Sequence, residues 1–232
     1  MSFIDHLSIL KKKLNCFKKS YSFGSVDLLV NYFFKYKKKG IYLDVGCQHP
    51  VSNNNTYLLY KKGWSGVNID LDKKSIDLFN LVRKKDININ TAISSGVSEK
   101  KLYFYHDKSA INTLNKEVSN FQSAKVKEVR TIKTNSLNNI LEQNNINKID
   151  YLNIDVEGHE INVLLGLDIR KYLPDIISIE YLDLTMGHLE FKNNNLQNVI
   201  ESDIYKYMVS KGYSLINWNH ADLIFINNDL RD

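Results

Sequence analysis

The residues with the clearest chemical potential lie in the stretch YLNIDVEGHE, residues 151–160. Directly after an apolar run it carries Asp155, Glu157, His159 and Glu160. Carboxylates and neutral imidazole accept protons near neutral pH, and carboxylates also bind divalent cations. An apolar run that stops at such groups is typical of a buried strand whose end faces a site. We therefore expect Asp155, Glu157 and His159 to be functional, and Glu160 to point to solvent or to a lysine.

A second pair of motifs, LDVGCQHP at 43–50 and VNIDLD at 67–72, has the order strand, glycine turn, strand and acid. Gly46 lets the backbone approach a ligand closely, and Asp70 can accept hydrogen bonds from ribose hydroxyls. A dinucleotide site would carry the pattern G-x-G-x-x-G, whereas this turn has one glycine. Without the later glycines a pyrophosphate has no close helix N-terminus to bind. The pattern favours a nucleoside ligand without a pyrophosphate, such as S-adenosylmethionine.

The elements that must position these residues follow from the apolar pattern. From residue 40 onward, short apolar runs alternate with segments whose apolar residues recur every three or four positions, which predicts an α/β sheet with helices on both faces. Ligands of such sheets bind at the carboxyl ends of the strands, so Asp44, Asp70, Asp155 and Glu180 are expected to face one crevice. We expect strands at 40–46, 64–72, 87–93, 149–156 and 174–182, helices at 1–36, 72–84, 136–143, 159–167 and 196–211, and a closing antiparallel pair at 213–218 and 221–227.

Composition narrows the class of protein. The chain has 232 residues, of which 43% are hydrophobic, and this suits one large domain or a domain with small appendages. No apolar run approaches the roughly 18 residues that span a bilayer, and the N-terminus lacks the apolar region of a signal peptide. The two cysteines, Cys16 and Cys47, form neither a disulfide framework nor a zinc ligand set. We expect a cytoplasmic protein.

The net charge of +5 comes largely from lysines near the N-terminus. Such a basic segment is most often a solvated helix face, although it could contact an anionic surface. Because no nucleic-acid-binding motif is present, we expect no nucleic-acid partner. Weak membrane association through Lys11–Lys13, Lys18 and Lys19 stays open. The oligomeric state is not indicated by the sequence.

The segments DVGCQHPVSNNNTYLLYKKGWSGVNIDLD and NIDVEGHEINVLLGLD resemble the FkbM family of S-adenosylmethionine-dependent methyltransferases. The resemblance covers roughly residues 40–226 and implies a Rossmann-like class I methyltransferase fold: a seven-stranded, mostly parallel sheet with an antiparallel last strand. Many members methylate a hydroxyl of a sugar or another polar small molecule. We divide the chain into an N-terminal helical appendage, 1–36, and an FkbM-like methyltransferase domain, 37–232.

The resemblance also implies roles for individual residues. Commoner members continue the first motif as G-A-N-x-G, whereas here it runs from Gly46 through Cys47, Gln48 and His49 to Pro50, which leaves the role of His49 open. The implied cofactor-binding residues are Asp44 and Gly46 in the first turn, Cys47 and Gln48 beside the amino-acid part, Asp70 on the ribose, Thr91 and Ala92 by the adenine, and Asp155 near the methyl group; Asp155, Glu157 and His159 would border the reacting methyl.

Methyl transfer from a sulfonium is an in-line displacement, so the enzyme must align the acceptor oxygen and accept its proton. His159 and His49 are candidate bases, and Glu157 or Asp155 could orient the imidazole or act directly. The same carboxylates could instead hold Mg²⁺ or another divalent metal. We expect an S-adenosylmethionine-dependent O-methyltransferase acting on a sugar or glycan precursor, which could be nucleotide- or lipid-linked. The alternatives are a nicotinamide-dependent dehydrogenase on the same kind of sheet and a non-catalytic nucleic-acid-binding module.

Overall fold

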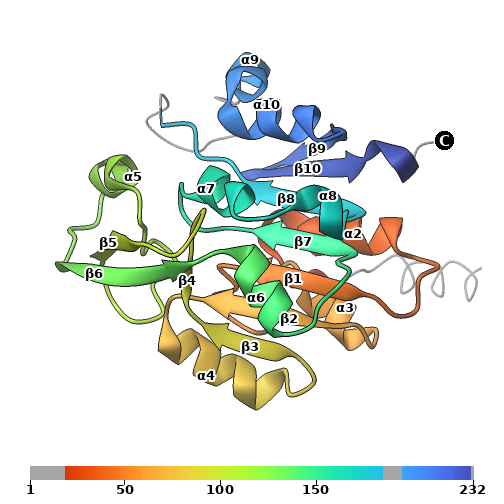
Figure 1. Ribbon diagram of the computed structural model, residues 1–232, viewed down its shortest axis with the longest axis horizontal. Coiled ribbons are helices and arrows are strands. Elements are labelled where there is room, and N and C mark those ends of the chain that lie inside the picture. The colour runs from red at the N-terminus through yellow and green to blue at the C-terminus, as the bar shows by residue number, and fades with distance from the viewer. Residues whose placement is uncertain (1–18, 185–194, 231–232) are drawn as a thin grey trace, which may run out of the picture.

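The computed structural model describes residues 19–184 and 195–230. Its centre is a seven-stranded sheet in the order β3-β2-β1-β7-β8-β10-β9 (Figure 1). The five strands from β3 to β8 run parallel, and β10 is antiparallel to both of its neighbours. The predicted mostly parallel sheet with its antiparallel last strand is thereby confirmed. Its strands are β1 Ile41–Val45, β2 Ser65–Asp70, β3 Ile87–Asn90, β7 Tyr151–Ile154, β8 Ile176–Glu180, β9 Tyr213–Asn219 and β10 Asp222–Asn227.

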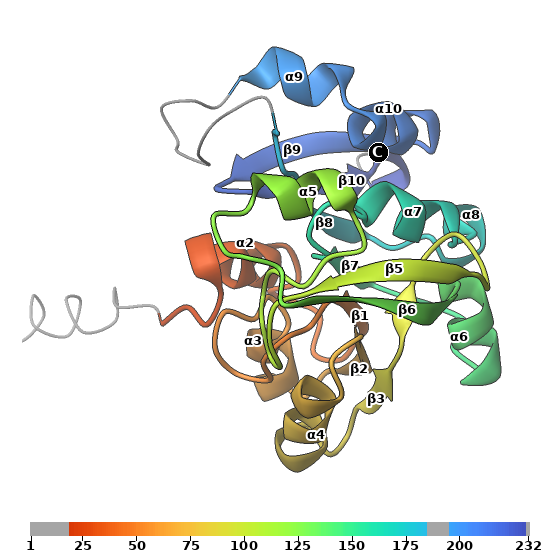
Figure 2. The same ribbon diagram turned by 90° about the vertical axis from the view of Figure 1, so that its left-hand side faces the viewer.

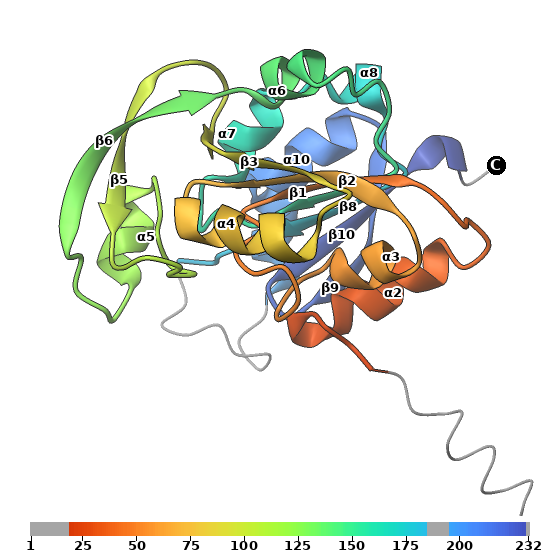
Figure 3. The ribbon, with the colours of Figure 1, turned by 90° about the horizontal axis from the view of Figure 1, so that it is seen from below.

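Helices cover both faces of this sheet, as predicted (Figure 3). Side chains alternate between the faces along each strand, so Leu43 and Val45 of β1 pack with α6, α7 and α10, whereas Tyr42 packs with α2 and α3. The helical segments are η1 Phe23–Ser25, α2 Val26–Phe33, α3 Tyr57–Lys61, α4 Lys73–Val82, α5 Lys116–Phe121, α6 Leu137–Gln143, α7 Glu160–Leu165, α8 Ile169–Tyr172, α9 Leu196–Glu201, α10 Asp203–Ser210 and η3 Asn228–Leu230.

A second, three-stranded sheet stands beside the first (Figure 2). It consists of β4 Ala92–Ile93, β5 Glu99–Phe104 and β6 Glu128–Asn135, with β6 in the middle. Only Thr91 separates β4 from the end of β3, so the small sheet begins at the carboxyl edge of the large one. The single strand that we expect over 87–93 is therefore two strands in two sheets.

The prediction of one continuous helix over 196–211 is also wrong, because two short helices, α9 and α10, occupy this range. Ser202 adopts an extended conformation, φ −66° and ψ 151°, which ends α9. The Ser202 hydroxyl then accepts a hydrogen bond from the backbone N–H of Tyr205 and so caps α10. The apolar pattern of residues 196–211 continues across the break, and both short helices pack their apolar residues on the same face of the sheet.

The N-terminal segment departs from the expected continuous helix as well. Residues 19–22 are not helical, because the Asp27 carboxylate accepts hydrogen bonds from Ser20, Tyr21 and Ser22 and folds this stretch back on α2. Helix α2 buries Val26 and Val30 against the sheet. The boundary between residues 36 and 37 stays a prediction, and residues 1–18, with the lysine cluster at 11–13, lie outside the described residues. Within the described ranges no helix has the length and apolar character to cross a membrane.

The amino edge of the sheet is held by a partly buried lysine that bridges two carboxylates. Lys37 donates to Asp150 at 2.7 Å and to Asp175 at 3.1 Å. The second oxygen of Asp150 accepts the backbone N–H of Ile41 at 2.8 Å. One carboxylate thus ties the starts of β1, β7 and β8 together, which fixes the register that brings their opposite ends to one place.

Candidate active site

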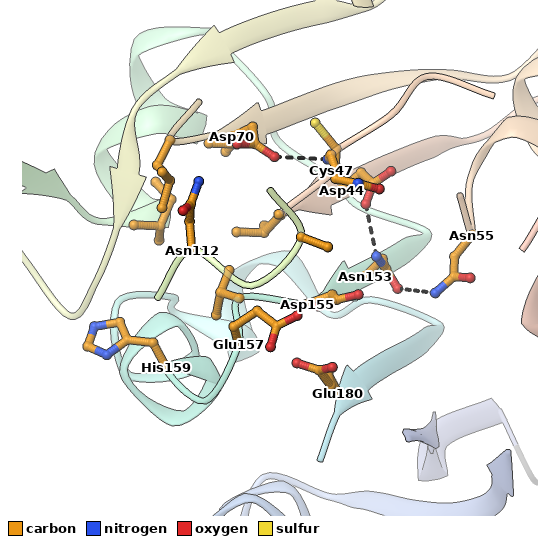
Figure 4. A pocket seen from close by; sticks show the side chains of 18 of the residues that line it. Asp44, Cys47, Asn55, Asp70, Asn112, Asn153, Asp155, Glu157, His159 and Glu180 are labelled. Atoms are coloured by element: carbon orange, nitrogen blue, oxygen red, sulfur yellow. Dashed lines mark hydrogen bonds between the residues drawn. The ribbon is translucent and has the colours of Figure 1, made fainter. Parts of the chain in front are cut away.

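A cavity of about 270 Å³ lies at the carboxyl edge of the large sheet (Figure 4). It is lined by residues at or just beyond the carboxyl ends of β1, β2, β7 and β8 and at the start of β10. Phe23, the linker into β4 and residues of the loops at 53–55 and 109–114 complete the wall. As predicted, Asp44, Asp70, Asp155 and Glu180 face this one crevice. The cavity has a glycine-turn half, around Gly46, Asp70 and Thr91, and an acidic half, around Asp155, Glu157, Glu180 and Asp222.

The turn after β1 requires glycine at position 46. Gly46 has φ +79°, a left-handed conformation that other residues adopt only at a cost. A Cβ atom here would also overlap the backbone carbonyl oxygen of Asp155. The turn is held by the backbone N–H groups of Gly46 and Cys47, which both donate to the carbonyl of Ile69, at 2.9 and 3.2 Å. The backbones at the ends of β1 and β2 therefore contact each other directly, with no side chain between them.

Asp70 ends β2 and fixes the glycine turn from the other side. One carboxylate oxygen accepts the N–H of Gln48 at 2.8 Å, and the other accepts the N–H of Asp72 at 2.7 Å. Each oxygen has a second lone pair with which to accept a further donor. Burial raises the pKa of Asp70 to about 6, against the lowering effect of the two N–H donors. Thr91 and Ala92 line the wall beyond Asp70.

The acidic half contains four carboxyl groups from three strand ends. Asp155 and Glu180 share a hydrogen bond, which requires one of them to carry a proton. Burial, and then the charge of Asp155, raise the pKa of Glu157 to about 9, and burial raises the pKa of Asp222 to about 7. Of the described residues, no lysine or arginine lines the cavity. This half of the cavity is therefore suited to cations and to hydrogen-bond donors.

Asp44, which is fully buried, is occupied by protein partners. Its carboxylate accepts hydrogen bonds from Thr56 at 2.8 Å, Asn54 at 3.1 Å and Asn153 at 2.9 Å. The amide oxygen of Asn153 in turn accepts a hydrogen bond from Asn55 at 2.9 Å (Figure 4). Asp44 therefore joins the loop at 53–56 to the ends of β1 and β7. It shapes the cavity floor by holding these neighbours.

The comparisons with known proteins agree with this arrangement. The family model described as "Methyltransferase FkbM domain" matches residues 44–215, which include Gly46, Asp70, Asp155, Glu157 and Glu180 of the cavity. The chain belongs to the FkbM methyltransferase family. It is a methyltransferase, and this class of domain uses S-adenosylmethionine as its methyl donor. The nicotinamide-dehydrogenase alternative is thereby set aside.

Two further comparisons, with curated protein sequences and with solved structures, carry no argument about the function. No curated protein sequence matches the FkbM chain. Among solved structures, it is similar to HI0767 of Haemophilus influenzae, described as a possible methylase, with 10% identity, 87% coverage of each chain and a TM-score of 0.38.

In this FkbM methyltransferase both ring nitrogens of His159 have hydrogen-bond partners, whereas a general base needs a free nitrogen. The side-chain amide of Asn162 donates to Nδ1 at 3.4 Å, so the ring proton is on Nε2, which lies 3.0 Å from the hydroxyl of Ser94. Burial lowers the pKa of His159 to about 4. Figure 4 shows the ring turned away from Glu157 and Glu180. Its role as a base stays a prediction, and the geometry favours a positioning role at the start of α7.

His49 and Cys47 both lie in the glycine turn. The His49 Nδ1 atom accepts the backbone N–H groups of Val51 and Ser52, at 3.2 and 3.0 Å, and the residue is not among those that line the cavity. Burial raises the pKa of the Cys47 thiol well above its usual range. Cys47 and Gln48 line the cavity, whereas their contacts to the cofactor and the base role of His49 stay predictions.

Two buried charges were not anticipated from the sequence. Glu160 is 3% exposed rather than solvent-facing, because its carboxylate accepts the N–H groups of Val156 and Gly158 in the turn before α7. Arg83 is fully buried and donates to the carbonyl of Pro50 and to the side chains of Asn54 and Thr56. Arg83 thereby holds the loop that bonds Asp44. In sequence it follows an apolar run and precedes two lysines, so it resembles a solvated helix end.

Proposed function

We propose that this FkbM methyltransferase is an O-methyltransferase that acts on a hydroxyl of a sugar or glycan precursor. The methyl-transfer activity follows from the family, and the nature of the acceptor is the proposal. The single observation that carries it is the acidic half of the cavity, which adjoins the glycine turn and offers carboxylates without a neighbouring lysine or arginine among the described residues. Carboxylate oxygens accept hydrogen bonds from the hydroxyls of a polyol.

In this proposal the cofactor occupies the glycine-turn half. The ribose hydroxyls bind the remaining lone pairs of Asp70, and the adenine lies along Thr91 and Ala92. The amino-acid part follows the backbone past Gly46 toward Asp155. Because the sulfonium is positively charged, the carboxylates of the acidic half favour its placement beside Asp155.

The chemical step then takes place between the two halves. The acceptor oxygen attacks the methyl carbon, the carbon–sulfur bond breaks, and its electron pair stays on sulfur as S-adenosylhomocysteine forms. The hydroxyl proton passes to a base, and the predicted bases that line the cavity are Asp155, Glu157 and His159, of which the two acids belong to its acidic half. A positioned base contributes about 10²–10⁴-fold to such a step. Alignment of oxygen, carbon and sulfur contributes the rest.

The rim of the acidic half suits a sugar ring. Phe23 is 61% exposed and lines the cavity, and its ring meets that of His220 edge-on with 4.6 Å between centroids. An exposed aromatic face packs well against the apolar C–H face of a sugar. A pyrophosphate would find no cation in the cavity wall among the described residues, so a nucleotide-linked acceptor would place its phosphates outside.

The test is methyl transfer to defined acceptors. The enzyme is incubated with ¹³C-methyl-labelled S-adenosylmethionine and a panel of free sugars, sugar nucleotides, lipid-linked sugars and amines, and products are read by mass spectrometry and NMR. We expect an O-methyl product from at least one carbohydrate, and Glu157→Gln should lower turnover by about 10²-fold or more. Labelling of amines alone, with no carbohydrate product, would reject the proposal.

A further inference from the structure

The acidic half of the cavity has a feature that its hydrogen bonds do not explain. Asp155, Glu157 and Glu180 each place one carboxylate oxygen so that the three atoms lie within 4.8 Å of one another. In Figure 4 the three side chains point toward a common space. Like charges at this distance repel, and a half-buried group of them is stabilised by protons or by a cation.

The fold forces this convergence. Strands β7 and β8 are parallel neighbours with Ile154 opposite Ile179, so the next residues along, Asp155 and Glu180, come side by side at the carboxyl edge. Glu157 returns over Asp155 because it has φ +56°, a conformation that is uncommon for a residue with a side chain. The turn is held there by Thr113, whose hydroxyl donates to the Glu157 carbonyl at 2.6 Å.

One carboxylate oxygen of the three acids has no hydrogen-bond partner, unlike that of a neighbouring acid. Glu160 accepts two backbone N–H groups. By contrast, the Oε2 atom of Glu180 is shielded from solvent and has no hydrogen-bond partner, although Glu180 shares a bond with Asp155 through its carboxyl group. An unpartnered buried carboxylate oxygen is costly. The carboxyl group that carries it converges with those of Asp155 and Glu157.

We propose that Asp155, Glu157 and Glu180 bind a divalent cation with oxygen ligands, and that this cation binds hydroxyls of the acceptor. The second part rests on the proposed function, whereas the first does not. Calcium–oxygen bonds measure about 2.3–2.6 Å, so oxygens up to about 4.8 Å apart can share one ion. Manganese or magnesium would draw the carboxylates slightly closer. Water and acceptor hydroxyls would complete the coordination.

Such a cation would add chemistry that the carboxylates alone do not supply. An acceptor hydroxyl bound to it is more acidic than a free one, because the positive charge stabilises the alkoxide. The hydroxyl proton leaves to water or to a carboxylate, the oxygen attacks the methyl carbon, and sulfur keeps the electron pair of the broken bond. Two hydroxyls held by one ion would also fix which of them reacts.

The test measures Mn²⁺ binding to the full chain by calorimetry and by electron paramagnetic resonance, with S-adenosylhomocysteine titrated into the same preparation. We expect saturable Mn²⁺ binding, a rise in Tm with Mn²⁺, and at least tenfold weaker binding in Glu180→Gln. Asp77→Asn is the matched control, because its carboxylate sits in an exposed ion pair with Lys73 and its loss should leave binding unchanged.

The Gln substitution also guards against misfolding. Glutamine keeps the size of Glu180 and takes one ionisable group out of a crowded acidic cluster. The metal-free Tm of Glu180→Gln should therefore stay at or above that of the unaltered chain, while the Mn²⁺-dependent rise in Tm is lost. Mn²⁺ binding that survives in Glu180→Gln, or absence of binding at millimolar Mn²⁺, would overturn the inference. If S-adenosylhomocysteine still binds in the latter case, the proposed function stands without the metal. If Mn²⁺ binds but no carbohydrate is methylated, the inferred metal site stands and the acceptor proposal is rejected.

Discussion

Substitution of Asp70 by alanine should remove most of the affinity for the cofactor product. Its two oxygens hold the N–H groups of Gln48 and Asp72 and retain lone pairs for two ribose hydroxyls. Hydrogen bonds to a charged group are worth about 1.5–3 kcal/mol each, so two of them amount to at least about 3 kcal/mol. Because about 1.4 kcal/mol is a factor of ten, Kd for S-adenosylhomocysteine should rise by about 10²-fold or more.

The matched control for this experiment is Asp72→Ala. Asp72 lies two residues on, and its carboxylate accepts the N–H groups of Lys74 and Lys108, but it does not line the cavity. Its loss should lower stability by about 1 kcal/mol, the value of a helix cap, with little change in Kd. Calorimetry measures Kd, and thermal melts show that both variants fold. A Kd for Asp70→Ala within about threefold of the original, or an equal loss in both variants, would refute the reasoning.

Four other outcomes follow from the same contacts. Because burial raises the pKa of Asp70 to about 6, its carboxylate is protonated below that pH, so affinity for S-adenosylhomocysteine should fall as pH drops through about 6; calorimetry at pH 5 and 8 checks this, and equal affinities would contradict it. Gly46→Ala should lower stability by more than about 2 kcal/mol, since its Cβ overlaps a neighbouring carbonyl in a left-handed turn; an unchanged urea midpoint would count against this packing. If His159 only positions α7, His159→Ala should lower Tm while turnover of the folded variant falls less than about tenfold, whereas a loss of about 10²-fold would restore it as the base. Burial alone would raise the pKa of Asp150, but the hydrogen bonds from Lys37 and a backbone N–H leave that pKa lowered. The ionised Asp150 therefore stabilises the fold above about pH 4, and this stabilisation is lost as pH falls. Asp150→Ala should cost about 2 kcal/mol at pH 7 in urea melts and less at pH 3, and a pH-independent cost would contradict this account.

The order of strands and helices could be predicted because the apolar runs are short and several of them end at a glycine or an acid. The points at which a predicted helix or strand is interrupted could not be predicted. Ser202 interrupts a pattern that remains amphipathic on both sides, and its capping hydrogen bond decides the break. Likewise Thr91 falls inside one apolar run, yet β4 leaves the large sheet to pair with β6, a partner more than 40 residues away.

The candidate site was predictable as a set of strand ends but not as a set of contacts. Parallel strands bring Asp70 and Asp155 to one edge by topology alone. The orientation of His159 depends on Ser94, and the burial of Arg83 depends on a loop about 30 residues earlier, so neither follows from local spacing. The convergence of Glu157 with Glu180 depends on a left-handed turn residue that the sequence pattern does not mark.

The most direct test of the central claim is a calorimetric comparison of S-adenosylhomocysteine and NAD⁺ on the same preparation of the full chain. A turn with one glycine, Gly46, and a cavity without lysine or arginine among the described residues should bind the first and exclude the second, whose pyrophosphate has no partner there. We predict saturable one-to-one binding of S-adenosylhomocysteine and no measurable binding of NAD⁺. A folded protein that fails to bind S-adenosylhomocysteine, or that binds NAD⁺ more tightly, would contradict the account.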